Sequence, residues 1–277
     1  FYVSGQLLTE DYYVANKLMK GFIGSANIDT NSRLCMASTV AGHKRAFGTD
    51  TVPGVYEDLE LADLVVLVGS NLAWCHPVIY QRLAAARVEH GTKVVVVDPR
   101  RTSTCDIADL HLKLAPGSDA ALFNGLLAHL ASSGEIDSTF VENNVSGFDA
   151  ALAAARADDP ALTELPKAEL KAFYEMFATT KKVVTVFSQG INQSSSGSDK
   201  VNSIINCHLA TGRIGHPGCG PFSMTGQPNA MGGRETGGLA NMLAAHLDLE
   251  NAAHREAVQD FWKAPTIATA AGLKAVD

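Results

Sequence analysis

Three short apolar runs constrain the fold of this chain more than any other feature of its sequence. They span residues 64–68 (LVVLV), 93–97 (KVVVV) and 182–187 (KVVTVF). Continuous β-branched runs of this length are typical of central strands covered on both faces, which favours parallel pairing. Between the first two runs, residues 77–90 begin with Pro77 at a helix N1-like position and carry apolar side chains at helical spacing. This order of strand, helix and strand predicts a right-handed βαβ unit.

The rest of the chain continues the alternation. We expect a short strand at residues 111–114, helices at 119–131 and 167–179, and a helix at 201–209 after the third apolar run. Residues 211–238 are rich in glycine and poor in charge, which indicates backbone packed against itself or against a ligand. A chain of 277 residues with this pattern predicts one large α/β domain or two smaller ones.

Composition places the chain among globular proteins and disfavours two classes of partner. Hydrophobic residues make up 46% and charged residues 18%, and no apolar run approaches the roughly 20 residues that a membrane span requires. Lys and Arg number 22 against 29 Asp and Glu, a formal net charge of −7, without a dense basic cluster. We therefore expect neither a membrane nor a nucleic-acid partner.

The five cysteines form no recognisable metal or disulfide motif. They are Cys35, Cys75, Cys105, Cys207 and Cys219, and none lies in a C-x-x-C pair. Their spacing indicates no zinc knuckle, ferredoxin-type cluster or disulfide framework. Unpaired thiols fit a reducing compartment, so we expect a cytoplasmic protein.

Polar segments follow each of the three apolar runs, at residues 69–77, 98–104 and 188–197, and the first and third of them contain glycine. In open α/β sheets ligands bind beyond the carboxyl ends of the strands, so all three segments are expected to face one ligand. Glycine lets backbone approach a phosphate, polar donors near a helix N-terminus favour an anion, and an acidic strand end suits a ribose hydroxyl or a guanine edge. No G-x-G-x-x-G or Walker loop is present, which disfavours plain NAD binding and P-loop chemistry.

Several long motifs resemble one enzyme family. Residues 31–42 read NSRLCMASTVAG and residues 50–54 read DTVPG; further matches are YEDLELADLVVLVGSN (56–71), DPRRT, PGSD, QGINQSSSGSDKVNSIINCHLATGRIG (189–215) and GPFSMTGQPNAMGGRETGG (220–238). In order and over nearly the whole chain, these motifs resemble molybdopterin-dependent oxidoreductases, specifically the catalytic subunits of bacterial assimilatory nitrate reductases.

The resemblance implies a molybdenum-bis(molybdopterin guanine dinucleotide) cofactor whose metal takes one protein thiolate, and the matching residue is Cys35. A soft sulfur ligand suits a thiophilic metal that is already held by dithiolene sulfurs. Taken alone, a cysteine between Leu34 and Met36 is typical of a small buried hydrophobic residue, and only the surrounding motif changes that interpretation.

The same matching implies a set of polar residues around the cofactor. Some would hold a guanine nucleotide, and two glutamines would lie near a pterin. Simpler roles remain open for several: a helix N-cap for Ser118 or Asp119, a strand-end turn for Asp98, and a surface amide for either glutamine. The cofactor-binding candidates are Gln6, Asn31, Gly69, Ser70 and Asn71, then Asp98, Thr102, Gly117, Ser118 and Asp119 for the nucleotide, and Gln189 and Gln193 for the pterin.

The substrate expectation depends on four positions. Formate dehydrogenases of this family generally place His after the metal-binding residue, whereas Met36 follows Cys35 here, as in the nitrate reductases. Arg234 matches the family's substrate-pocket arginine, and a guanidinium pairs well with two oxygens of a planar anion. Asp50 matches a pocket carboxylate that would orient a proton or water, and Met36 would line the wall. The simpler interpretation of Arg234 is a surface side chain paired with Glu235.

The resemblance therefore implies nitrate as substrate and its two-electron reduction to nitrite by oxygen-atom transfer. It implies two three-layer α/β lobes with mainly parallel sheets: a first lobe of residues 1–34 and 185–277, and an inserted Rossmann-like lobe of residues 35–184. Family members also carry an N-terminal [4Fe-4S] domain and a C-terminal barrel domain. Since neither is found in this sequence, we expect a central fragment that lacks sustained turnover alone.

Two rival functions remain open. The same fold serves formate dehydrogenases and other molybdenum or tungsten enzymes, and it also occurs in non-catalytic nucleotide-binding or scaffold modules. For a nitrate reductase, the electron donor would be ferredoxin, flavodoxin or an NADH-linked subunit.

Overall fold

The computed structural model describes residues 1–277 and divides into two compact units. Unit 1 comprises Phe1–Ala37 and Thr225–Asp277, and unit 2 comprises Ser38–Met224. Unit 2 is therefore an uninterrupted stretch of chain inserted into unit 1. None of the helices combines the length and apolar character needed to cross a bilayer.

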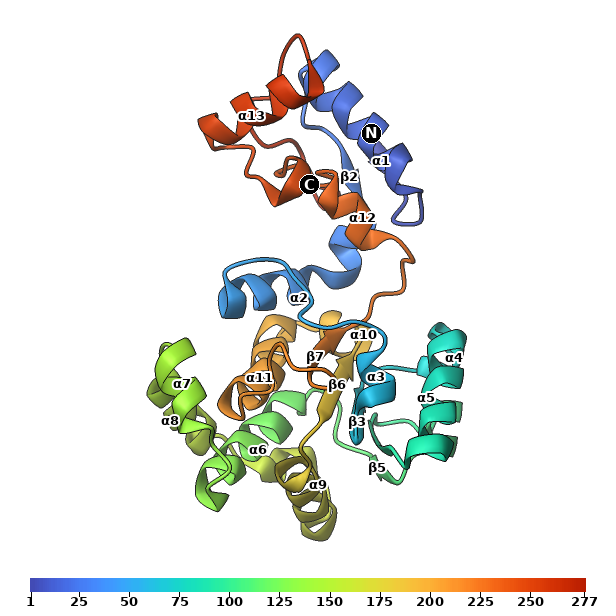
Figure 1. Ribbon diagram of the computed structural model, residues 1–277, viewed down its shortest axis with the longest axis vertical. Helices are drawn as coiled ribbons and strands as arrows, with labels where there is room; N and C mark the ends of the chain where they lie inside the picture. The colour runs from blue at the N-terminus through green and yellow to red at the C-terminus, as the bar shows by residue number, and fades with distance from the viewer. The chain divides into compact units, whose positions relative to one another are not determined.

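A five-stranded parallel sheet forms the centre of unit 2 (Figure 1). The strand order is β5-β4-β3-β6-β7, so the first strand lies in the middle and later strands add on either side. Val66 of β3 pairs with Val95 of β4 on one side and with Thr185 of β6 on the other. The strands are β3 (Leu64–Val68), β4 (Lys93–Val97), β5 (Leu110–Leu112), β6 (Val183–Phe187) and β7 (Gly220–Ser223).

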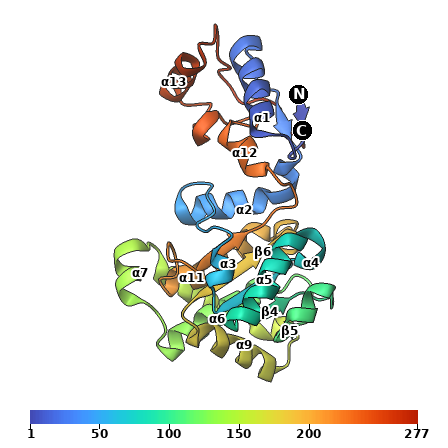
Figure 2. The same ribbon diagram turned by 45° about the vertical axis from the view of Figure 1, so that its right-hand side comes forward.

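Helices cover both faces of this sheet and make unit 2 a three-layer structure (Figures 1 and 2). Side chains alternate along each strand: Val66 and Val68 pack into one core, Val65 and Leu67 into the other. This two-sided burial explains why the strands read as continuous apolar runs. One core is closed by α6 (Asp119–Ser133), α9 (Lys167–Thr179) and α11 (Gly197–Ala210), and the other by α3 (Asp58–Leu61), α4 (Leu72–Cys75) and α5 (Pro77–His90).

The helix ends of unit 2 follow from its sequence. Helix α5 begins with Pro77 at N1 and ends at Gly91 in the left-handed conformation, and α6 likewise ends at Gly134. Glycine adopts this conformation without a Cβ penalty, so it stops both helices cleanly. The shorter elements are η2 (Ser103–Ile107), α7 (Ser138–Asn144), α8 (Phe148–Ala157), η3 (Pro160–Thr163) and α10 (Gln189–Asn192).

Unit 1 combines short helices with one pair of two-residue parallel strands. Its small core includes Leu243, Val258 and Trp262, and the Trp262 ring meets the Tyr13 ring edge-on at 6.4 Å. The elements are β1 (Tyr2–Val3), α1 (Thr9–Asn16), η1 (Lys17–Ile23), β2 (Asp29–Thr30), α12 (Ala230–Glu235), η4 (Ala244–His246) and α13 (Ala252–Trp262).

Helix α2 (Ser32–Phe47) carries the chain from unit 1 into unit 2. Its backbone departs from helical geometry at Met36, where φ is −136° and ψ is 25°. The kink therefore follows Cys35 directly and lies just before the crossing at 37–38.

The expected α/β class with parallel strands is confirmed, but the expected lobe boundary needs correction. Strand β6 pairs along its whole length with β3, and β7 pairs with β6, so both belong to unit 2. The chain consequently leaves unit 2 after Met224, not after residue 184. Unit 1 contains only β1 and β2 where a second full sheet was expected, because the third apolar run completes the first sheet.

Candidate functional site

The strand order of unit 2 reverses direction between β3 and β6. Strands β4 and β5 lie on one side of β3, and β6 and β7 lie on the other. The loops that leave β3 and β6 therefore lie at the point of the carboxyl edge where open α/β sheets bind ligands. We call this region, formed by residues 69–71, 98–102, 117–119 and 188–193, the sheet-edge site.

Two glycines form the centre of the sheet-edge site. The Gly190 amide donates to the Gly69 carbonyl at 3.0 Å, and Gly69 has φ +53°. A Cβ on Gly69 would lie 2.6 Å from the Gly190 α-carbon. Both loops thus need glycine so that their backbones can approach each other. The sequence pattern did not reveal Gly190 as the neighbour of Gly69.

Polar groups follow Gly69 directly. Ser70 is 3% exposed, and its hydroxyl has no hydrogen-bond partner within the protein. The Asn71 side-chain oxygen accepts from the Thr104 hydroxyl at 3.0 Å, and that hydroxyl in turn accepts from the Ala73 amide at 3.1 Å. Asn71 is therefore held in one orientation, while the buried Ser70 hydroxyl remains available as a donor.

Asp98 closes the turn after β4. Its carboxylate accepts from the Arg100 amide at 2.8 Å, and its carbonyl lies 2.9 Å from the ring nitrogen Nε2 of His111. The simpler role as a strand-end turn is therefore realised, with the side chain mostly buried. Thr102 is half-buried, and its carbonyl accepts from the Cys105 amide at 2.9 Å.

The loop after β5 ends in a buried ion pair. Gly117 has φ +95° and open space around its α-carbon, and the Ser118 hydroxyl donates to the Ala115 carbonyl at 2.7 Å, so it does not cap α6. Asp119 lies 2.6 Å from the Lys200 ammonium, with side chains 11% and 3% exposed. Lys200 was not predicted, although a lysine between the apolar residues of the buried face of α11 was a usable signal.

The two glutamines behave differently. Gln189 begins α10, half-buried, and its side-chain oxygen accepts from the Ser188 hydroxyl at 2.9 Å. Gln193 is exposed, and only its backbone amide is held, by the Gln189 carbonyl at 2.9 Å.

Asp50 is the remaining predicted site residue of unit 2. It is 4% exposed, and the loop that follows it is held by the buried side chain of Asp58. The Asp58 carboxylate accepts from the Val55 amide and from the Gly218 amide, each at 2.8 Å. The DTVPG segment is thus fixed against the rest of unit 2 by one buried carboxylate.

In unit 1 the Cys35 thiol lies in a polar cluster. Cys35 is 8% exposed, and its sulfur is 3.5 Å from the Thr225 hydroxyl. Thr225 donates to the Gln227 side-chain oxygen at 2.7 Å, and the Asn31 side-chain oxygen accepts from the Gly5 amide at 2.7 Å. Thr225 and Gln227 were not predicted, because they come from the other end of the chain.

The cluster around Cys35 is tightly packed. A Cβ on Gly5 would lie 2.5 Å from the Ser32 hydroxyl and 2.7 Å from the Gln227 side chain. Ser32 is 4% exposed, and its hydroxyl has no partner within the protein. The neighbouring Gln6 is exposed, and its amide donates to the Ser4 hydroxyl at 3.2 Å.

Met36 and Arg234 are both buried in unit 1, each 2% exposed. Arg234 lies on α12 with one guanidinium nitrogen 2.5 Å from the Met231 sulfur. The interpretation of Arg234 as a surface partner of Glu235 is wrong, because Glu235 pairs instead with His246 at 2.9 Å. A buried arginine on a short helix is consistent with a role in binding an anion.

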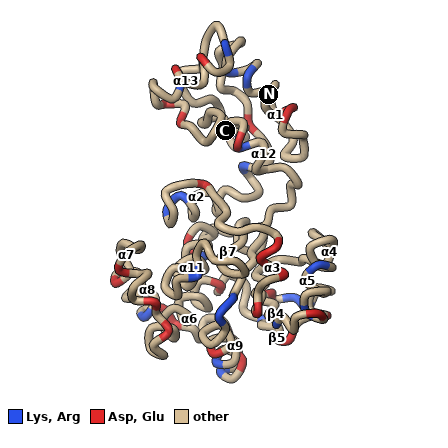
Figure 3. Tube along the Cα trace, viewed as in Figure 1, with Lys and Arg blue, Asp and Glu red and all other residues tan.

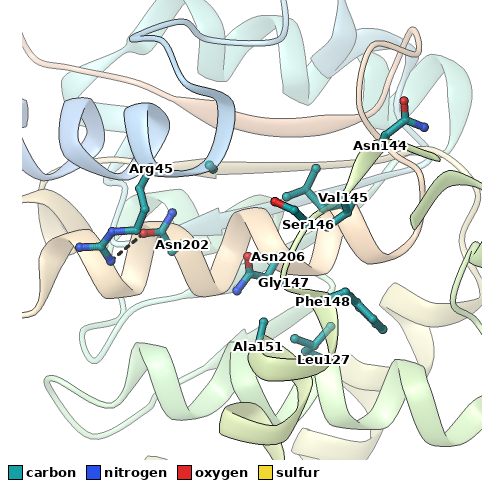
Figure 4. A pocket seen from close by; sticks show the side chains of 12 residues that line it. Arg45, Leu127, Asn144, Val145, Ser146, Gly147, Phe148, Ala151, Asn202 and Asn206 are labelled. Atoms are coloured by element: carbon teal, nitrogen blue, oxygen red, sulfur yellow. Dashed lines mark hydrogen bonds between the residues drawn. The ribbon is translucent and has the colours of Figure 1, made fainter. Parts of the chain in front are cut away.

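Two surface features lie apart from these groups. A pocket of about 370 Å³ opens between α6, α11 and the α7–α8 loop, and Arg45 donates to Asn202 there at 3.0 Å (Figure 4). It includes none of the predicted site residues. Basic and acidic side chains are interspersed along both units (Figure 3).

Comparison with known proteins identifies the family. A sequence model of the molybdopterin oxidoreductase family matches residues 1–272. Nitrate reductases of Klebsiella oxytoca and Shewanella frigidimarina are 58% and 51% identical over the whole chain, which spans 32% and 30% of their lengths. The structure resembles acetylene hydratase from Pelobacter acetylenicus with a TM-score of 0.60 and 24% identity, over 75% of this chain and 29% of that one. Since the family model matches residues 1–272 of the 277, this chain belongs to the molybdopterin oxidoreductase family.

Proposed function

We propose that this chain is the cofactor- and nitrate-binding part of a nitrate reductase. The observation that carries the proposal is the setting of Cys35, whose sulfur lies beside the Thr225 hydroxyl in a polar cluster. Cys105 and Cys207, by contrast, lie within the two apolar cores of unit 2. A thiol kept among polar groups is suited to ligand chemistry, whereas a cysteine in an apolar core acts as a small hydrophobic residue.

The residues present fit a molybdenum-bis(molybdopterin guanine dinucleotide) cofactor. Cys35 would supply the one protein thiolate, a soft ligand that matches a thiophilic metal. Buried Ser32 and Ser70 each carry a hydroxyl without a protein partner, as expected of groups that donate to a polar cofactor. When bound, this cofactor supplies the two-electron redox chemistry.

At the sheet-edge site, the chain's own groups would recognise the nucleotide. Ser70 and the backbone around Gly69 offer donors to phosphate, while the carboxylates of Asp98 and Asp119 suit ribose hydroxyls or a guanine edge. Lys200 neutralises Asp119 and holds its carboxylate in place. Thr102, Gly117, Ser118, Gln189 and Gln193 would line the remaining surface of the nucleotide and pterin.

For the substrate, Arg234 is the proposed nitrate ligand. Its planar guanidinium can donate two parallel hydrogen bonds to two nitrate oxygens, and its burial excludes competing water. Met36 would form an apolar wall, and Asp50 would hold the water or proton that the reaction consumes. The overall change is NO₃⁻ + 2 H⁺ + 2 e⁻ → NO₂⁻ + H₂O. Formate oxidation instead requires an acceptor for a proton from carbon, and the residue after Cys35 here is Met36.

In the complete enzyme we propose a [4Fe-4S] cluster as the electron inlet and ferredoxin, flavodoxin or an NADH-linked subunit as the donor. We also propose that the enzyme acts in the cytoplasm, a compartment that keeps thiols reduced. The chain alone would lack sustained turnover.

Replacement of Cys35 tests the proposal. In the cofactor-loaded enzyme that contains this chain, Cys35→Ala should lose nitrate reduction and most bound molybdenum, because alanine offers the metal no ligand atom. Cys75→Ala is the matched control, since Cys75 is exposed. Metal analysis and nitrate and formate kinetics give the readout. Full molybdenum content and full nitrate turnover in Cys35→Ala would refute the assignment, and faster formate than nitrate turnover in the unmodified enzyme would favour the formate dehydrogenase alternative.

A further inference from the structure

A buried lysine joins the first and last parts of unit 1. Lys20 lies in the π-helical segment η1 and is fully buried. Its ammonium donates to the carbonyls of Gly237, Leu239 and Met242, the last two at 2.9 and 2.7 Å, and to the Asn16 side-chain oxygen at 2.9 Å. All of these groups belong to unit 1.

The turn formed by residues 237–242 depends on this cation. Its three carbonyls point toward one atom, and without a positive charge between them their dipoles would repel one another inside the protein. The ammonium has three N–H donors, which the three carbonyls and the Asn16 oxygen share as four acceptors, so none of its donors is left unused. Burial lowers the pKa of Lys20 to about 7, and the nearby Asp29 carboxylate, which itself pairs with Arg33, raises it. The burial of an amine costs free energy unless hydrogen bonds compensate for the water it loses, as the four acceptors do here.

The turn is connected directly to the helix that bears Arg234. The Gly237 amide donates to the Arg234 carbonyl at 3.0 Å, and the Gly238 amide donates to the Gly233 carbonyl at 2.5 Å. Gly237 has φ +85°, and a Cβ there would lie 2.7 Å from the Leu243 carbonyl carbon. Because the turn has no free space on that side, a shift of Gly237 would move the end of α12.

We propose that Lys20 is a positioning residue for Arg234: it fixes the turn 237–242 and thereby the place at which α12 presents the guanidinium to substrate. The inference rests on the proposed function of Arg234 as the nitrate ligand. A purely structural lysine would affect stability alone, whereas a positioning lysine affects nitrate binding beyond its effect on stability.

The test uses Lys20→Met and Lys20→Arg in the cofactor-loaded enzyme. Lys20→Met should raise the nitrate KM about tenfold while kcat changes little, because a displaced guanidinium weakens substrate binding. Lys20→Arg keeps the charge but displaces it, so its KM should rise less, by about threefold. Amide hydrogen exchange should quicken across residues 237–242 in both variants, which gives a readout that does not depend on turnover.

A matched control separates positioning from loss of stability. Val258→Ala removes two methyl groups from the core of the same unit, at a residue that is not a hydrogen-bond partner of Lys20, and should lower the melting temperature without changing the nitrate KM. If Lys20→Met does not accumulate as folded protein, Lys20→Arg decides. The proposal is overturned if the Lys20 variant that is measured raises the nitrate KM no more than Val258→Ala does. It is also overturned if amide hydrogen exchange across residues 237–242 is unchanged.

Arg234→Gln distinguishes this proposal from the one on which it rests. If Arg234→Gln leaves the nitrate KM unchanged, the assignment of Arg234 itself fails. If Arg234→Gln raises KM and the Lys20 variants do not, only the role of Lys20 fails.

Discussion

Residues of one type perform different tasks in this chain because their surroundings differ. Cys207 is fully buried in an apolar core, and this burial raises the pKa of its thiol far above the usual range. Such a thiol stays protonated and inert. Cys35 is almost as buried, but its sulfur lies 3.5 Å from the Thr225 hydroxyl. The sequence motif distinguishes Cys35 from Cys207, whereas burial alone would group the two cysteines together.

The buried His208 should make the stability of unit 2 depend on pH. Its ring nitrogen Nε2 lies 2.8 Å from the Thr185 hydroxyl, and burial, with the nearby Arg213 charge, holds its pKa well below 6.5. The unfolded state therefore binds a proton near pH 6.5 that the folded state does not accept. The free energy of unfolding is therefore not reduced by His208 above that pH. It falls as the pH decreases below it, by up to about 1.4 kcal/mol per pH unit. Urea unfolding between pH 5 and 7, roughly the range of histidine titration, measures this slope.

His208→Asn is the control for that measurement, because asparagine keeps a polar partner for Thr185 without titrating. Its unfolding free energy should change less steeply over the same interval. Identical slopes for both proteins would show that other groups cause the dependence.

At the scale of elements, sequence periodicity predicted most of unit 2. The three apolar runs are β3, β4 and β6, and the helix expected at 167–179 coincides with α9. What periodicity could not reveal is which strand pairs with which. The return of β6 to the free side of β3 joins residues more than 100 positions apart, and no local pattern encodes it. For the same reason Thr225, Lys200 and Lys20 were not predicted as partners of other site residues.

The close approach of the loops after β3 and β6 gives a sharp test of this topology. Gly69→Ala should lose about 2–4 kcal/mol of stability, from left-handed backbone strain and from a Cβ placed 2.6 Å from the Gly190 α-carbon. Gly91→Ala is the matched control: its φ is +76°, but a Cβ would meet nothing within 4 Å. It should lose only about 1–2 kcal/mol. Chemical denaturation of the two variants gives the comparison, and equal losses would contradict the packed crossing.

At the scale of the whole molecule, the two units differ in how they are built. Unit 2 is one continuous segment with a complete sheet and a core on each face, whereas unit 1 combines both ends of the chain around a smaller core. A polypeptide of residues 38–224 should therefore fold by itself and unfold in one cooperative step. Circular dichroism and calorimetry of that polypeptide check this, and a broad, non-cooperative transition would show that unit 2 depends on unit 1.

The two chain crossings have a consequence for how such a protein can change over evolution. On the unit 2 side, the Thr39 and Ser223 hydroxyls lie 3.1 Å apart; on the unit 1 side, Cys35 and Thr225 are 3.5 Å apart. An inserted domain whose two ends lie side by side can be exchanged as a whole, because any other domain with adjacent ends can be joined at the same two positions. Cys35 belongs to unit 1, two residues before the boundary, so replacing unit 2 by another domain would leave this thiol in the protein.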